Sequence, residues 1–104
     1  MTNLMDKYNK ILIKIHDDVK LEDYYVEVTI GGFLRLDKEE LSKLAKALWD
    51  YSWEVKGNFT AENDKYFQSW YFEFPRSQVV IREVAEKLFL YLEPLFPNKV
   101  GFYE

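Results

Sequence analysis

The single histidine of the chain lies close to four acidic residues, and such a group can bind metal ions or catalyse proton transfer. His16 is followed directly by Asp17 and Asp18, and Glu22-Asp23 come a few residues later. A transition-metal site needs further imidazole or thiolate ligands, but the sequence has no second histidine and no cysteine. The acidic residues also lack the spacing of a calcium-binding loop. We therefore interpret this stretch as a turn and a solvated loop, and we expect no metal site.

Motifs of covalent and phosphate chemistry are missing from the sequence. No serine or threonine stands in the setting of an activated nucleophile, and neither GxxxxGK nor GxGxxG occurs. Gly31-Gly32 lacks flanking residues that bind phosphate. Glu62 and Asp64 are paired carboxylates, but they fall in a predicted loop where nothing assigns one the acid role and the other the base role. We expect a protein that is not an enzyme and that needs no cofactor.

Aromatic residues are concentrated in the segment KYFQSWYFEFP, residues 65–75. Alternation along a strand sorts its side chains onto two faces. One face, which we expect the helices to cover, carries Trp70, Phe72 and Phe74. Burying each of these rings contributes about 1.5–3 kcal/mol, so the protein core alone accounts for them.

The other face of this strand offers a binding surface. Phe67 and Tyr71 point away from the predicted helices, and Tyr25 on a neighbouring strand is expected to join them. An exposed aromatic sheet face can stack nucleic-acid bases, bind another protein or form the seam of a homodimer. Few basic residues flank these positions, which disfavours nucleic acid. Tyrosine is also common on exposed strands for conformational reasons alone, so an inert surface is the alternative.

The second predicted helix is apolar over most of its surface. Leu90 and Val79 fall within its polar strip, and Phe89 lies beside that strip. A helix that is apolar nearly all round needs more than one neighbour. Two explanations stay open: the C-terminal segment 94–104 folds over this side, or a partner binds at Phe89 and Leu90.

Periodicity and capping signals locate the elements. Asp37 is the expected N-cap of the first helix, with Glu40 closing a capping box, and Ser77 is the expected N-cap of the second. Gly31-Gly32 is expected to end the second strand through a positive φ. The predicted elements are strands 9–16, 24–30, 53–60 and 66–74, helices from 37 to 51–53 and from 77 to 93, a hairpin loop at 60–64, and a short edge strand through Val100 and Phe102.

This order, ββαββα, predicts an α+β fold: a four-stranded antiparallel sheet with two helices packed on one face, to which the C-terminal edge strand can add. The 104 residues, 48% of them hydrophobic, are enough for one domain, 1–104, with its own core. No apolar run approaches the roughly 20 residues that span a membrane, and the first residues lack the apolar core of a signal peptide. We expect a cytoplasmic protein that contacts no membrane.

The leading functional hypothesis is a small acidic interaction protein, of inhibitor or adaptor type, that binds another protein or a second copy of itself as a homodimer. Its net charge of −4 argues against direct nucleic-acid binding. In size and composition it resembles many small prokaryotic or phage proteins, inhibitors among them, although no motif carries that resemblance. The predicted contact residues are Phe67, Tyr71, Tyr25, Phe89 and Leu90.

Two other functions stay open at this stage. One is a homo-oligomer that binds a nucleotide or another flat small molecule without catalysis. Aromatic rings would stack such a ligand, and Arg35, Arg76 or Arg82 would pair with its anionic group. The other is a purely structural or assembly subunit.

Overall fold

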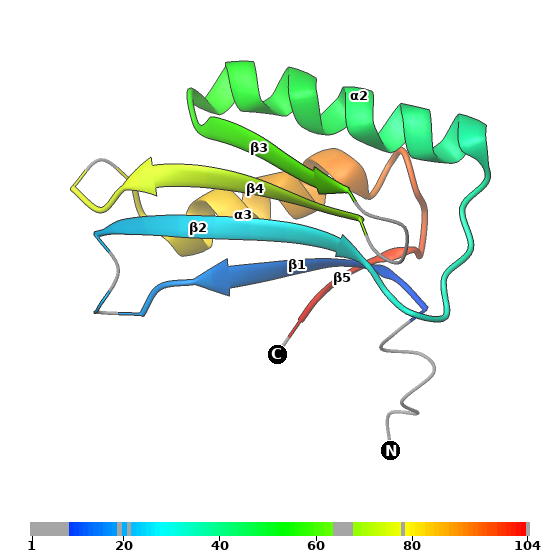
Figure 1. The fold of residues 1–104 in the computed structure, drawn as a ribbon, viewed down its shortest axis with the longest axis horizontal. Coiled ribbons are helices and arrows are strands. Elements are labelled where there is room, and N and C mark those ends of the chain that lie inside the picture. The colour runs from blue at the N-terminus through cyan, green and yellow to red at the C-terminus, as the bar shows by residue number, and fades with distance from the viewer. Residues whose placement is uncertain (1–8, 19, 21, 64–67, 78, 104) are drawn as a thin grey trace.

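A computed structural model gives the arrangement of the chain (Figure 1) and describes residues 9–18, 20, 22–63, 68–77 and 79–103. The predicted α+β order is confirmed, and the C-terminal strand is present. The elements in chain order are β1 (Ile11–His16), β2 (Asp23–Ile30), α2 (Lys38–Val55), β3 (Asn58–Asn63), β4 (Gln68–Pro75), α3 (Ile81–Leu92) and β5 (Val100–Phe102).

The sheet has five strands in the order β3-β4-β2-β1-β5. The predicted four strands pair antiparallel, as expected. β5 adds to β1 in parallel, with Ile11 opposite Val100, so the complete sheet is mixed. A parallel neighbour is possible here because a long connection, which includes α3, separates the two strands.

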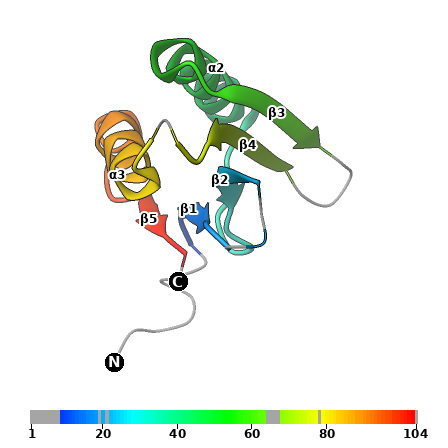
Figure 2. The same ribbon diagram turned by 90° about the vertical axis from the view of Figure 1, so that its left-hand side faces the viewer.

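Both helices cover the same face of the sheet (Figure 2). The apolar side of each strand and the inward side of each helix form one buried cluster. Phe72 and Phe74 of β4 lie in it, as predicted, together with Leu48 of α2 and Leu88 of α3. Trp70 is buried as well, which confirms the predicted sorting of these three aromatic rings.

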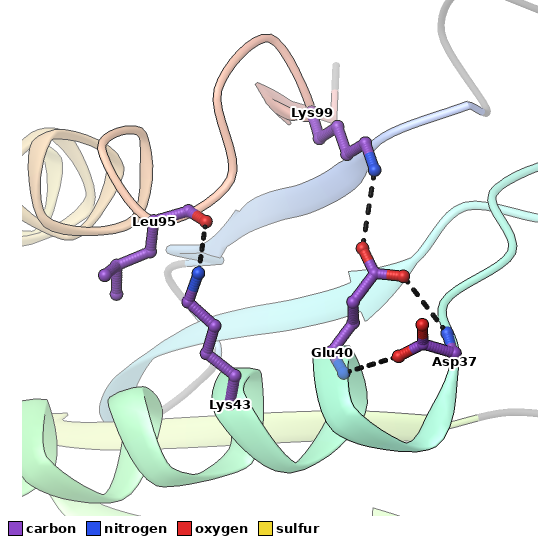
Figure 3. A network of polar contacts seen from close by, with 5 residues as sticks. All are labelled: Asp37, Glu40, Lys43, Leu95 and Lys99. Atoms are coloured by element: carbon purple, nitrogen blue, oxygen red, sulfur yellow. Dashed lines mark hydrogen bonds and ion pairs between the residues drawn. The ribbon is translucent and has the colours of Figure 1, made fainter.

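The predicted capping box at the start of α2 is confirmed. The Glu40 backbone N–H donates to the Asp37 carboxylate at 2.8 Å, and the Asp37 N–H donates to the Glu40 carboxylate at 3.2 Å. Figure 3 shows how this end is also tied to the segment between α3 and β5. Lys43 Nζ donates to the Leu95 carbonyl at 2.9 Å, and Lys99 Nζ pairs with Glu40 at 3.4 Å. These contacts hold one end of α2 against the C-terminal part of the chain.

The predicted strand at 53–60 is wrong in its limits. α2 continues to Val55, and the strand begins at Asn58 and runs to Asn63, through most of the expected hairpin loop. The helix extends because Val55 still packs against the core. It ends at Lys56, which takes a left-handed conformation with φ 57°. Tertiary packing of the last turn, rather than local preference, sets this boundary.

Two predicted local signals are also corrected. Ser77 does not cap α3, because the helix begins at Ile81 after Val80, with no side-chain cap. The helix starts at Ile81, which is also its first buried side chain. β2 does end before Gly31-Gly32, but no glycine in the described ranges has a positive φ. Gly31 instead continues along β1, where its N–H donates to the Lys10 carbonyl at 2.8 Å.

The C-terminal segment folds against α3. This is one of the two explanations that the sequence offered for the apolar character of the helix. Phe96 and Val100 are buried in the core. The Phe102 ring stacks on the Phe89 ring, with centroids 5.4 Å apart. The chain itself therefore covers much of Phe89, whereas Leu90 stays 68% exposed.

Close packing at Gly57 generates a stability prediction. A Cβ at this position would lie 2.8 Å from two atoms of the Phe74 ring, which is buried and cannot move aside easily. We expect Gly57→Ala to lower the free energy of unfolding by about 1–3 kcal/mol, measured by urea denaturation. Gly32→Ala is the matched control, because nothing lies within 4 Å of its Cβ position. Equal stability of the two variants would contradict this packing constraint.

Candidate functional site

The sheet face opposite the helices carries the candidate site. Side chains that alternate with the buried ones point to this face, among them Tyr25 and Glu27 of β2 and Tyr71 and Glu73 of β4. These four side chains are neither fully buried nor fully exposed. Register places Tyr25 directly opposite Glu73, and Glu27 directly opposite Tyr71. Two tyrosines and two carboxylates therefore alternate in a block at the centre of the sheet.

One end of the same face is not accessible surface. Leu12 of β1 and Ser69 of β4 lie at this end, and each is directly opposite Thr29 of β2. Both are buried. A partner approaching this side would therefore meet the other end, around Tyr25 and Tyr71.

Glu27 organises the centre of the face. Its side chain is only 15% exposed. One carboxylate oxygen accepts a hydrogen bond from His16 Nε2 at 2.7 Å, and the other accepts one from the Tyr71 hydroxyl at 3.2 Å. Burial, followed by the charge of Glu27 and this hydrogen bond, raises the pKa of Tyr71 above its ordinary value. The network fixes the Tyr71 hydroxyl in place before any ligand binds.

A shallow hollow of about 390 Å³ opens over this network. It extends across the strands from β1 to β3 and is lined by His16, Tyr25, Thr60, Glu62 and Tyr71. Hydroxyl groups, a carboxylate and aromatic surface meet in it, which suits binding of a polar or cationic group. His16 bonds to Glu27, and within the described part of the chain no hydroxyl is bonded to His16 as a nucleophile would be to its base.

The carboxyl groups of Asp23 and Glu73 form a pair beside Tyr25. A hydrogen bond with Asp23, then burial and the Asp23 charge, raises the pKa of Glu73. The Glu73 charge, followed by burial and the charges of Asp23 and Glu22, raises the pKa of Tyr25. Both pKa values are raised because negative charge is concentrated at this end of the face.

A larger groove lies on the opposite side of the molecule, between the end of α2 and the start of α3. Its volume is about 740 Å³, and its described lining includes Phe74, Val80, Leu90 and Tyr51. The Tyr51 hydroxyl donates to the Val84 carbonyl at 3.0 Å and so links the two helices. Burial, with a smaller effect of the Glu54 charge, raises the pKa of Tyr51 to about 12. The groove is mainly apolar, and its charged lining residues are Glu54, Glu83 and Lys87.

Sequence reasoning missed a third surface, formed by two tryptophans on α2. Trp49 is 53% and Trp53 70% exposed, and their ring centroids lie 5.9 Å apart in an edge-to-face contact. Trp49 also contacts Phe59 of β3, with centroids 6.0 Å apart. The available signal was their i, i+4 spacing on a helix face other than that of Leu44 and Leu48.

The predicted contact residues do not form one surface. Tyr25 and Tyr71 line the same hollow. Leu90 lines the groove on the helical side, and Phe89 stacks on Phe102. Phe67 lies outside the described residues. Tyr25 and Tyr71 therefore share one surface and Leu90 lies on another, and the contact roles of all five residues stay predictions.

The three arginines proposed to pair with an anionic ligand lie apart from the groove lining. Arg76 donates to the Asp18 carbonyl and lies over the Tyr24 ring. Arg35 donates to the Gly32 carbonyl at 3.3 Å. Arg82 lines a different hollow, together with Phe102. The groove therefore has no arginine among its described lining residues.

Comparison with protein-family models, curated proteins and solved structures found no match to this chain. Among the described residues, no three or more histidine, aspartate and glutamate side chains are grouped to hold a metal ion. Within the same ranges, no helix has the length and apolar character needed to cross a membrane.

The Glu27 network generates a prediction about the ionisation of Tyr71. Glu27→Gln removes the charge of the nearest carboxylate, so we expect the pKa of Tyr71 to fall towards its ordinary value of 10.0. Ring ¹³C NMR titration measures it, with Tyr71→Phe to assign the signal. Glu62→Gln is the matched control, because Glu62 has a weaker effect on Tyr71. Equal shifts in both variants would show that Glu27 is not the dominant neighbour.

The link between the helices generates a pH prediction. The pKa of Tyr51 is about 12 in the folded protein against 10.0 for an ordinary tyrosine, so between these values the unfolded chain loses its proton first. Tyr51 therefore contributes stability below pH 10 that is lost as the pH rises towards 12. We expect Tyr51→Phe to cost about 1 kcal/mol near neutral pH and to weaken the loss at alkaline pH. Denaturation at several pH values tests this, with exposed Tyr103→Phe as control; an unchanged pH profile would contradict it.

Proposed function

We propose that this protein acts by binding another protein, without catalysis, and that the uncovered sheet face around Tyr25 and Tyr71 is its contact surface. The observation that carries the proposal is the convergence of both tyrosines on one hollow, on a face that neither helix covers. Tyrosine is enriched at protein interfaces because it adds a large contact area and a polar hydroxyl with few rotatable bonds.

Preorganisation supports the choice of this face. Tyr25 and Tyr71 stand on central strands, paired on both sides, so their backbone positions are fixed. The bond from the Tyr71 hydroxyl to Glu27 holds that side chain further. Binding then loses little conformational entropy, and more of the contact energy appears as affinity.

The arrangement of His16 supports binding rather than catalysis. His16 and Glu27 have the geometry of a base and its orienting carboxylate, but the hydroxyl in this network, that of Tyr71, bonds to Glu27. An activated nucleophile would instead bond to the imidazole. The network is therefore suited to orienting side chains at a contact surface.

The groove between the helices favours a second candidate function, the binding of a small apolar molecule. Its volume of about 740 Å³ is within the range of small-molecule sites. Glu54 and Glu83 outnumber Lys87 in its lining, which disfavours an anionic nucleotide. A small adduct in native mass spectrometry that is lost in Leu90→Asp would favour this function over protein binding.

Site-specific photo-crosslinking tests the proposed function. A photoreactive phenylalanine derivative replaces Tyr71 in the full chain, which is expressed in the cells that naturally make the protein. We expect one protein partner to be crosslinked, and Tyr25→Ala/Tyr71→Ala to weaken that complex more than tenfold while unfolding cooperatively. The loss would reflect two aromatic contacts worth at least about 1.4 kcal/mol together.

The same probe at Trp53 and at Leu90 provides the controls, because these positions test the two other surfaces. Crosslinking from either control, but not from position 71, would move the contact surface away from the sheet face. The absence of a crosslinked protein from all three positions would contradict the proposed function.

A further inference from the structure

Among the described residues, the uncovered sheet face carries more acidic than basic side chains. Three carboxylates on it, those of Asp23, Glu62 and Glu73, form no ion pair with a lysine or arginine of the described residues. Lys14 is directly opposite Glu27, but its ammonium group lies 4.9 Å from the centre of the Tyr103 ring at the β5 edge. Lys14 therefore contacts the Tyr103 ring and forms no ion pair with these three carboxylates.

One of these carboxylates lines the hollow, and the other two are close to Tyr25 along the sheet. Glu62 lines the hollow from β3. Glu73 is directly opposite Tyr25, and Asp23 precedes Tyr25 by two positions on β2. The carboxyl groups of Asp23 and Glu73 are close enough to share a hydrogen bond, which raises the pKa of Glu73. Such crowding of like charges is unfavourable and would be relieved by a cation placed between or beside them.

From this charge and geometry we infer that the partner presents a basic extended segment, with an arginine side chain occupying the hollow between Tyr25 and Tyr71. This inference rests on the proposed function and adds the chemistry of the partner. A guanidinium group is planar, stacks on aromatic rings and bonds to carboxylates with two parallel N–H groups. The hollow offers both kinds of contact, from its two tyrosines and from the Glu62 carboxylate, and Glu73 lies directly opposite Tyr25.

The same charge distribution selects against other partners. An acidic segment, or the phosphates of a nucleic acid, would meet the carboxylates on this face and be repelled. Lysine would gain the charge attraction but lacks the planar group that stacks and bonds bidentately. An arginine-containing segment of a protein is therefore the occupant that uses all the described contacts.

A peptide titration followed by ¹H–¹⁵N NMR tests the inference on the full chain. The probe is acetyl-GRGRGRG-amide, and its neutral counterpart carries citrulline in place of arginine. We expect shifts centred on Tyr25, Thr60 and Tyr71, with at least fivefold weaker binding of the citrulline peptide. Affinity for the arginine peptide should fall as salt is raised, because exposed charge pairs are screened.

A charge-matched pair of variants separates the local site from general attraction to an acidic protein. Glu62→Gln/Glu73→Gln removes one charge that lines the hollow and one opposite Tyr25. Glu39→Gln/Glu86→Gln removes two exposed charges from the helices. We expect the first pair to weaken binding between about twofold and thirtyfold, the range for two exposed ion pairs, and the second pair to change it little. Equal losses in the two variants, or shifts centred elsewhere, would overturn the inference.

Failure of the inference and failure of the proposed function give different results in these experiments. If the Tyr71 crosslink persists but the arginine peptide does not bind the face, the basic-segment inference fails and the proposed function stands. If the peptide binds as expected but none of positions 71, 53 and 90 crosslinks a protein, the proposed function fails while the cation-binding site stands. Spermidine that binds at the hollow as tightly as the arginine peptide would assign the site to small polyamines and overturn the inference.

Discussion

The antiparallel pairing of β2 with β4 determines which side chain reaches each face of the sheet, and the other features depend on it. In this register Val26 is opposite Phe72 beneath the helices, while Glu27 is opposite Tyr71 on the uncovered side. A shift of one residue in either strand would exchange its two sets of side chains. That shift would expose Phe72 to water and bury a carboxylate, so the hydrophobic core enforces the register that builds the candidate site.

Different interactions dominate on the two faces of this strand pair. On the helical side, burial of apolar side chains holds α2 and α3 in place. On the other side, a carboxylate that is largely withdrawn from water, Glu27, is satisfied by two hydrogen bonds from neighbouring strands. Glu62 is exposed, Asp23 and Glu73 are half-buried, and none of the three forms an ion pair with a described lysine or arginine. The uncovered face is thus ordered at its centre and acidic at its margins.

The C-terminal segment covers part of the apolar surface of α3, a surface that in the sequence resembles a site for a partner. The sequence of α3 offered two explanations for its extra apolar residues, and stacking of Phe102 on Phe89 supports the intramolecular one for that position. Leu90 is directed to the groove instead. Exposed tryptophans on α2 were not anticipated, because a search for the core-facing stripe of a helix passes over residues on its other sides.

The sequence by itself determined the element order, the capping box at Asp37 and the sorting of Trp70, Phe72 and Phe74, because these follow from local periodicity and local hydrogen bonding. It also placed Tyr25 and Tyr71 on the same face, although nothing in their separation along the chain indicated that they share a hollow. Only the tertiary structure decided the end of α2, the start of α3 and the parallel addition of β5, since each is set by packing between distant segments. The bond from Tyr71 to Glu27 likewise joins residues 44 positions apart. Such contacts arise from strand order, which a single sequence does not encode in any local pattern.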